Sequence, residues 1–366
     1  MSLPSRLVVD SLPLSSRHPP FSLTLAAGEC VALLVAPPWD TAPLIDALAG
    51  HVRIPAGRIL LDGHDIGALP PGQRAIGVIS WRDPLFGHLS VRGNVAFPLS
   101  IRRVREPERG HRVHQALALL GLEAQADRRP SDLTPAETVR VQLARILVCD
   151  PALILLDDPL TQLDPIARRD MHHLLRRLAR ARGLTLLFIT HDREEALLMG
   201  ERIGILEGAV LRQIGTATEL LDRPADETVA GFFGEANRLT GRVEWVEDDV
   251  AHVRLSAGPS MDAMAAEGLL PDTLCVVCVR PERIATAFLS GDSDALGADA
   301  LAGTLSDMVH LGDHLRLRFR LEGGGELLVR RPAAQPTSGL RMDRPALLAW
   351  QAGHAIAFPL EDDQNR

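Results

Sequence analysis

Two carboxylates follow a short, wholly apolar run near the middle of the chain, and they are the clearest candidates for chemistry. The run covers residues 153–156, and Asp157 and Asp158 come directly after it. A continuous apolar run with polar boundaries predicts a strand that is covered on both faces. Ligands of α/β sheets bind at the carboxyl ends of such strands, where an aspartate can hold Mg²⁺ directly or through water. The pair is therefore a candidate metal site.

Polar motifs stand on both sides of this strand. Upstream, residues 133–145 read Leu-Thr-Pro-Ala-Glu-Thr-Val-Arg-Val-Gln-Leu-Ala-Arg, and downstream come Asp164 and then His191. This order and spacing resemble the ATP-binding cassette (ABC) ATPases, in which a signature loop, a carboxylate strand, a D-loop and a switch histidine follow one another. The resemblance implies that Asp158 and His191 occupy catalytic positions and that Asp157 occupies the position of a Mg²⁺ ligand.

The segments around these motifs alternate between strand-like and helix-like patterns over about the first 235 residues, which predicts an α/β fold with a mainly parallel sheet. We expect strands at residues 30–35, 57–62, 76–80, 153–156 and 184–189, and helices at residues 40–49, 107–122, 138–148 and 166–182. Together with the resemblance, this predicts a P-loop NTPase-like ABC core over residues 1–235, with a helical subdomain at about residues 82–146.

From about residue 236 the chain changes to short alternating segments separated by Gly, Asp and Pro, which predicts an all-β domain of one or two small barrels. Residues 279–282 and 310–313 resemble the accessory TOBE domain of ABC importers. Residues 85–95 and 231–237 resemble the importer subfamily that serves polyamine, iron, sulfate or sugar uptake. We therefore expect a TOBE-like, OB-like β-barrel domain over residues 236–366.

Cys275 and Cys278 form a lone CxxC inside an apolar run at residues 273–279. Side chains alternate along a strand, so positions three apart face opposite sides of a sheet. No second CxxC or nearby His pair completes a metal site, and we expect both to be buried core cysteines.

All 39 basic residues among the 366 are arginine, so the chain has no lysine. This excludes chemistry that needs a lysine ammonium, including phosphate binding by a P-loop lysine. Composition drift towards arginine explains the absence at the surface, but it cannot supply a lysine where a site requires one. The formal net charge of −8 also argues against a protein that mainly coats nucleic acid, and we expect no nucleic-acid partner.

The phosphate loop of the family corresponds to residues 35–44. In the family this loop is glycine-rich, its N–H groups cradle the phosphates, its lysine reaches the outer phosphates and its hydroxyl binds Mg²⁺. Counting back without gaps from the end of the following helix puts Thr41 at the lysine and Ala42 at the Mg²⁺ hydroxyl. Here no glycine remains, three prolines lack an N–H, and Asp40 adds a negative charge where phosphates would lie.

The other nucleotide contacts of the family are altered in parallel. In the signature loop, Thr134 and Glu137 stand at the serine and glutamine/glutamate positions, but both glycines are lost and Pro135 removes an N–H donor. Trp81 replaces the glutamine that touches Mg²⁺ and the attacking water in relatives. Asp158 replaces the catalytic glutamate and is one methylene shorter, which draws the base away from the water.

Asp157 and His191, which are kept from the family's motifs, can also be explained without a role in catalysis. Asp157 can cap a loop and His191 can hydrogen-bond backbone, so that both now serve folding. Family members bind ATP and Mg²⁺, and the resemblance therefore implies these cofactors, but the altered positions predict that their binding is lost.

One segment keeps the form that it has in the family, where the helical subdomain receives the coupling helix of the membrane permease. The matching residues that we assign to docking are Leu85, Phe86, His88, Arg92 and Asn94. The alternative is that the apolar ones are simply subdomain core. Docking is slightly favoured because His88, Arg92 and Asn94 also match and are not core types.

The leading hypothesis is an ABC importer subunit that docks on a membrane permease, forms a homodimer or a heterodimer with another ABC subunit, and is defective in ATP binding and hydrolysis. Its role would be structural or regulatory. No apolar run approaches the ~20 residues of a membrane span, so we expect any membrane role to be peripheral. The resemblance to importer subunits implies a cytoplasmic protein on the inner face of the membrane. The alternative is an active transport ATPase that uses Asp158 and a substitute cation, for which Arg53, Arg58 and Arg82 are nearest in sequence. A third possibility is that the β-domain senses a small anion or a regulatory protein.

Overall fold

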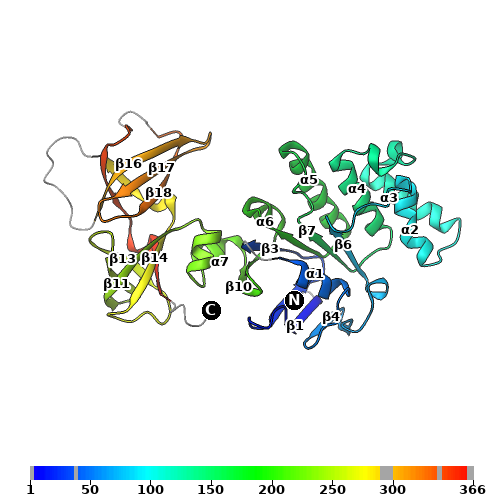
Figure 1. The fold of residues 1–366 in the computed structure, drawn as a ribbon, viewed down its shortest axis with the longest axis horizontal. Coiled ribbons are helices and arrows are strands. Elements are labelled where there is room, and N and C mark those ends of the chain that lie inside the picture. Colours follow the sequence, from blue (N-terminus) through cyan, green and yellow to red (C-terminus); the bar gives the residue numbers. More distant parts are fainter. Residues whose placement is uncertain (1–3, 37–39, 289–299, 336–339, 361–366) are drawn as a thin grey trace. The chain divides into compact units, whose positions relative to one another are not determined.

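The computed structural model describes residues 4–36, 40–288, 300–335 and 340–360, and it divides into two compact units, residues 1–219 and 220–366. The first unit is α/β and the second consists mainly of strands (Figure 1). This confirms the predicted order of an α/β region followed by a smaller region built mainly of strands. The domain boundary after residue 235 stays a prediction.

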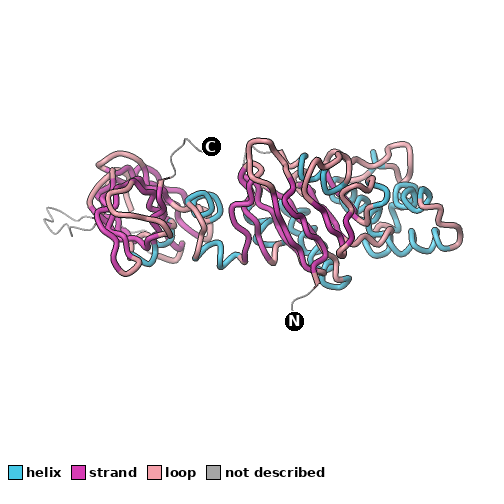
Figure 2. Tube along the Cα trace, turned by 90° about the horizontal axis from the view of Figure 1, so that it is seen from below, coloured by secondary structure: helices cyan, strands magenta, loops and turns pink. Residues whose placement is uncertain are grey.

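The first unit contains two sheets. Its strands are β1 (Ser5–Leu12), β2 (Phe21–Ala26), β3 (Cys30–Ala36), β4 (Arg58–Leu61), β5 (His64–Asp65), β6 (Ile76–Ser80), β7 (Leu153–Asp157), β8 (Leu186–Thr190), β9 (Arg202–Glu207) and β10 (Val210–Gly215). The larger sheet has the order β10-β9-β3-β8-β7-β6, and all of its neighbours pair in parallel except β10 with β9. The smaller sheet, β2-β1-β4-β5, is antiparallel. Figure 2 shows strands of this unit side by side.

The helices are α1 (Ala42–Ala49), α2 (Val91–Ile101), α3 (Glu108–Leu120), α4 (Pro135–Leu147), α5 (Pro165–Arg182), α6 (Arg193–Met199) and α7 (Ala217–Asp222). Alternate residues of β7 enter two different cores. Ile154 and Leu156 pack with α4 and α5, whereas Leu153 and Leu155 pack with α1 and the smaller sheet. The larger sheet is therefore covered on both faces, which explains the uninterrupted apolar runs of its strands.

Helices α2, α3 and α4 form a group beside β6 (Figure 1). Gly77 lets this group approach the sheet, because a Cβ at Gly77 would collide with the Ile146 side chain of α4. The predicted helices are all present, but α4 starts at Pro135, earlier than predicted, and α1 starts at Ala42, later than predicted. In both cases local hydrogen bonds at the first turn, described below, set the start.

Helix α1 is anchored at its carboxyl end by Arg74, whose side chain is 3% exposed. Its guanidinium donates to the carbonyls of Ala47 and Leu48 at 2.7 and 2.8 Å. It also donates to the carbonyls of Leu69 and Gly67, at 2.8 and 3.0 Å. Four carbonyls of α1 and of the segment after β5 thus depend on one buried cation.

The second unit contains β11 (Asn237–Glu247), β12 (Val250–Leu255), β13 (Ser260–Ala265), β14 (Leu274–Val279), β15 (Ala285–Phe288), β16 (Leu301–His310), β17 (His314–Leu321), β18 (Glu326–Pro332), β19 (Pro345–Ala349) and β20 (Ala355–Pro359). Strands β11-β12-β13-β20-β14 close a barrel, and β15-β19-β16-β17-β18 form a five-stranded sheet. Cys275 and Cys278 are buried on opposite faces of β14, as predicted, and burial raises the pKa of their thiols to about 11 and about 12.

In the described part of the chain, no helix is both long enough and apolar enough to cross a lipid bilayer.

Candidate functional site

The carboxyl edge of the larger sheet gathers most of the predicted site residues. Ser80 of β6 is the register partner of Asp157 in β7, and Asp157 is in turn paired with Ile189 of β8. The segments that follow these strands therefore emerge next to one another, and they carry Trp81, Asp158 and His191. Parallel strands thus bring together residues that lie far apart in sequence.

Asp157 is 3% exposed, and hydroxyl groups occupy both of its carboxylate oxygens. Thr41 Oγ1 donates to Asp157 Oδ1 at 2.8 Å, and Ser80 Oγ donates to Asp157 Oδ2 at 2.9 Å. We call these three residues the hydroxyl–carboxylate cluster. It ties the start of α1 to the ends of β6 and β7, and it satisfies the buried carboxylate without a metal ion.

The amino end of α1 is also closed by the chain itself. Asp40 Oδ1 accepts the N–H of Ala42 at 2.9 Å, and Pro43, in the first turn, has no N–H. An anion binds a helix N-terminus through free N–H groups, and here a side-chain carboxylate already takes one of them. Two other prolines of this loop, Pro37 and Pro38, lie outside the described residues.

Asp158 and His191 lie together, as the resemblance implies for catalytic positions. His191 Nε2 is 3.4 Å from Asp158 Oδ2, and His191 Nδ1 hydrogen-bonds the Val35 carbonyl oxygen at 3.0 Å. Asp158 adopts a left-handed backbone conformation with φ of 44°. Burial raises the pKa of Asp158, and His191 opposes that shift through its charge and its backbone N–H. The backbone contact of His191 agrees with the folding role considered from the sequence.

The signature-loop residues form a capping box at the start of α4. Thr134 Oγ1 accepts the N–H of Glu137 at 3.2 Å, and Glu137 Oε2 accepts the N–H of Thr134 at 2.8 Å. Gln125 Nε2 donates to the other oxygen of Glu137 at 3.0 Å. The backbone hydrogen bond from Thr134 lowers the pKa of Glu137. These groups satisfy one another, and they start α4 at Pro135.

A cavity of about 570 Å³ lies beside Asp158. Trp81, whose side chain is 73% exposed, forms part of its wall, together with Pro135 from α4 and Gln162 from the loop after β7. We call it the Asp158 cavity. Among the described residues that line it, Asp158 is the only one with an ionisable side chain.

The segment assigned to docking contains both buried and exposed members. Leu85 is buried, and Asn94 is fully buried. Asn94 Oδ1 accepts the Phe86 N–H at 2.8 Å, and its amide donates to the carbonyls of Phe86 and Ser90 at 3.1 and 3.0 Å. Any role of Asn94 in docking is therefore indirect, through the shape of this loop.

The remaining members face outward. His88 is exposed and lies near the Phe86 ring, with centroids 6.1 Å apart. Arg92 is exposed and its Nε lies 3.4 Å from Asp127 Oδ1. Phe86 is half-buried and packs against Phe97 of α2, with ring centroids 4.5 Å apart.

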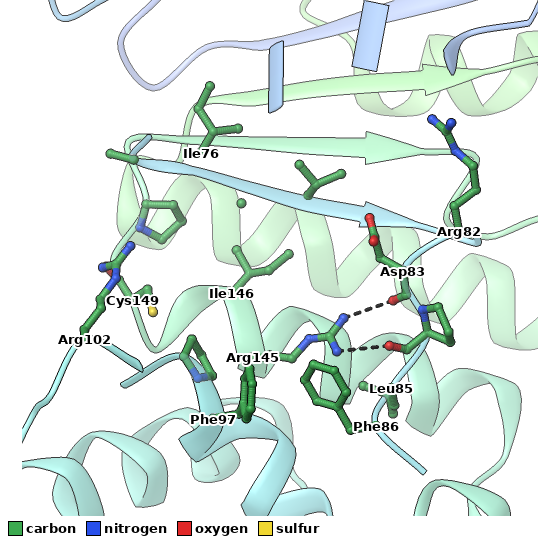
Figure 3. Close-up of a pocket in the computed structure, with 16 residues that line it drawn as sticks. Ile76, Arg82, Asp83, Leu85, Phe86, Phe97, Arg102, Arg145, Ile146 and Cys149 are labelled. Carbon is green, nitrogen blue, oxygen red and sulfur yellow. Dashed lines mark hydrogen bonds between the residues drawn. The ribbon is translucent and has the colours of Figure 1, made fainter. Parts of the chain in front are cut away.

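A second cavity, of about 490 Å³, opens beside these aromatic rings. Figure 3 shows Arg145 of α4 lying next to Phe86 and donating to the carbonyls of Asp83 and Pro84, at 3.0 and 3.1 Å. The Arg145 guanidinium carbon lies 5.5 Å from the centre of the Phe86 ring, within the range of a cation–π contact. We call this hollow the Phe86 cavity.

The arrangement can be compared with what Mg-ATP requires. The phosphates need positioned cations and free N–H groups, and the metal needs a free carboxylate oxygen. Of the three arginines nearest in sequence, Arg58 pairs with Asp10 at 3.0 Å, Arg82 lies 3.6 Å from Asp46, and Arg53 is exposed. The described residues of this edge do not supply the donor set that Mg-ATP needs, and Asp157, Asp158 and His191 lie together where the resemblance implies the metal and catalytic positions.

Sequence reasoning missed three residues of this region. Ser80 is the last residue of a predicted strand, which is a sequence signal that it lies at the edge of the sheet, but its pairing with Asp157 is seen only in the structure. Phe97 and Arg145 lie on helices, and nothing in their local sequence indicates that they line one cavity with Phe86.

Comparison with known proteins assigns the family. The ABC transporter family matches residues 19–161 and the TOBE domain family matches residues 277–358. The spermidine/putrescine import ATP-binding protein PotA of Mesorhizobium japonicum is 33% identical over 341 residues, which is 93% of this chain and 91% of the relative. PotA of Rubrobacter xylanophilus is 33% identical over 92% of this chain and 88% of its own length, and PotA 1 of Pseudomonas aeruginosa is 36% identical over 79% and 78%. The chain belongs to the family of ABC importer ATP-binding subunits that carry a TOBE domain.

Proposed function

We propose that this chain is an ABC importer subunit that docks on a membrane permease but does not bind or hydrolyse ATP, and that it serves a structural or regulatory role. The hydroxyl–carboxylate cluster is the observation that carries the proposal. Both oxygens of Asp157 already accept hydrogen bonds from Thr41 and Ser80, within a buried site. A Mg²⁺ ion would have to reach oxygens that already hold two hydroxyl donors in a site that is 3% exposed, and any donor that it displaced would be left as a buried hydroxyl without its partner.

Charge supports the same proposal. Transfer of a phosphoryl group depends on cations placed around its oxygens. The chain has no lysine, and Asp40 places a carboxylate at the start of α1. A like charge about 4 Å from a phosphate oxygen costs about 4 kcal/mol at an effective dielectric constant near 20.

In this proposal, a dimer with a second ABC subunit would not restore a complete ATP site. ABC sites combine the phosphate loop of one subunit with the signature loop of the other. In this chain both loops are altered, and Thr134 and Glu137 are engaged in a capping box. We therefore propose that a homodimer, or a heterodimer with another ABC subunit, would contain no site built from unaltered loops on both sides.

The Phe86 cavity supports docking. Phe97 is 38% exposed beside it, and a helix of a partner binds in an apolar groove through a few apolar anchors. We propose that a cytoplasmic helix of the permease lies there, which would hold this chain at the inner face of the membrane. The names of the relatives make a polyamine importer the first kind of permease to test.

Co-purification of the chain with the permease tests docking. Phe97→Asp should reduce the recovered complex by at least about tenfold, because it places a charge in an apolar contact. Ile101→Asp is the matched control, since Ile101 lies on the same helix, is 68% exposed and does not line the cavity. Equal recovery of both variants would contradict docking at this cavity.

Steady-state hydrolysis by the reconstituted complex tests the second half of the proposal. We expect the complex to hydrolyse ATP no faster than the permease alone. Solute-stimulated hydrolysis that Asp158→Asn abolishes would instead establish an active transport ATPase.

A further inference from the structure

The Asp158 cavity differs in charge from a phosphate site. Ser80 and Asp157 are register partners, so the residues that follow them, Trp81 and Asp158, leave neighbouring strands at the same edge. Both line a hollow of about 570 Å³. Asp158 lines this hollow, and its side chain is 27% exposed.

No cationic side chain occurs among the described residues that line this cavity, although the chain has 39 arginines. Its polar groups are one carboxylate, the amides of Gln142 and Gln162, a few hydroxyls and the indole of Trp81. The neighbour of this carboxylate, His191, lies 3.4 Å from Asp158 Oδ2 but does not line the cavity, so a bound anion would meet the carboxylate from this side, whereas a cation would meet its counter-charge. The lining therefore favours a cation.

The other walls indicate what kind of cation fits. Trp81 presents an indole that is 73% exposed, and indole faces attract ammonium groups. Leu85, Val139 and Leu163 are buried apolar residues that reach the same cavity. A hydrated metal ion would gain nothing from these walls, whereas an ammonium with a hydrocarbon tail would bury the tail against them.

We propose that the Asp158 cavity binds a primary alkylammonium ion, with the ammonium between the Asp158 carboxylate and the Trp81 indole and the alkyl tail against the apolar wall. The inference rests on the proposed absence of Mg-ATP from this edge of the sheet. Because the lining offers one carboxylate, a second ammonium on the ligand gains no second charged partner among the described residues that line the cavity.

Calorimetric titration of the full-length protein with n-butylammonium tests this site, and n-butanol serves as the uncharged probe of the same shape. We expect saturable binding of butylammonium and none of butanol. Asp158→Asn should weaken binding by at least about tenfold, since it removes the charged partner, and Trp81→Leu by about tenfold. Asparagine tolerates the left-handed conformation of Asp158, so this variant should fold.

Trp245→Phe is the matched control, because Trp245 is an exposed tryptophan of the second unit. The affinity of this variant for butylammonium should equal that of the wild type. Absence of saturable butylammonium binding by the wild type, or wild-type affinity for butylammonium in the two cavity variants, overturns the inference. A parallel titration with Mg-ATP separates the two proposals. If neither ligand binds, the ammonium site fails and the proposed function stands, and if Mg-ATP binds, the proposed function fails.

Discussion

Two connections leave the same edge of the larger sheet, one after β3 into α1 and one after β6 into α2, and they differ in how their polar groups are used. At the start of α1, Thr41 and Asp40 direct their side chains to groups of the same unit. After β6, by contrast, Trp81, His88 and Arg92 remain exposed, and residues of this segment line two cavities.

The difference indicates which surfaces of the first unit remain open to ligands or partners. In the connection into α1, groups that hold phosphate and metal in the family are replaced by hydrogen bonds within the chain. In the connection into α2, Asn94 shapes a loop whose aromatic residues remain accessible. We propose that the chain keeps a docking surface, while the edge that holds nucleotide in the family is closed by hydrogen bonds within the chain.

The largest expected effect is on the free energy of unfolding, and it comes from the carboxyl end of α1. If α1 is kept for the fold, its carboxyl-end anchor should matter greatly to stability. Arg74→Ala leaves the carbonyls of Ala47, Leu48, Gly67 and Leu69 without their donor, and we expect a loss of about 3–5 kcal/mol in the free energy of unfolding. Urea unfolding measures this, with exposed Arg53→Ala as a control that should change stability by less than about 0.5 kcal/mol.

The next effect tests the hydroxyl–carboxylate cluster. Asp157→Ala leaves two buried hydroxyls without an acceptor, and we expect the free energy of unfolding, measured with urea, to fall by about 2–4 kcal/mol. Asp157→Asn keeps one acceptor oxygen and should lose about half as much. If Asp157→Ala has the stability of the wild type, the cluster does not hold this edge together.

A smaller effect is expected in the signature loop. Thr134→Ala removes the cap of α4 and should lower the free energy of unfolding by about 1 kcal/mol. Thr134→Ser keeps the hydroxyl and should change the free energy of unfolding little. Equal unfolding curves for the two variants would mean that Thr134 is not used as a cap.

The smallest expected effect is the pH dependence of the contribution that Asp158 makes to stability. Because the folded-state pKa of Asp158 is raised, folding favours its protonated form, and its contribution to stability falls as the pH rises above the ordinary value of 3.8. Asp158→Asn should therefore be slightly more stable than the wild type at pH 7, and the difference should vanish below pH 3.8. A difference that instead grows on acidification would contradict the sign of this shift.

Local patterns were enough to predict much of the fold. Apolar runs such as residues 153–156 and 184–189 marked buried strands correctly, because strands covered on both faces leave no room for polar side chains. The lone CxxC was correctly assigned to a buried strand, because the alternation of side chains along a strand depends only on neighbours in sequence.

Long-range polar contacts were not predictable in the same way. Thr41 and Asp157 are separated by 116 residues, and gap-free counting cannot show that the Thr41 hydroxyl reaches this carboxylate. Arg74 resembles a surface residue in sequence, yet it is buried because four carbonyls surround it. Asn94 was considered unlike a core residue, but it is fully buried because loop backbone satisfies its amide.

Titration of the isolated protein with Mg-ATP in a calorimeter tests the central proposal most directly. We predict no saturable heat up to about 1 mM nucleotide, because the metal-binding carboxylate is engaged and the phosphate cations are missing. A dissociation constant in the micromolar range would contradict this account.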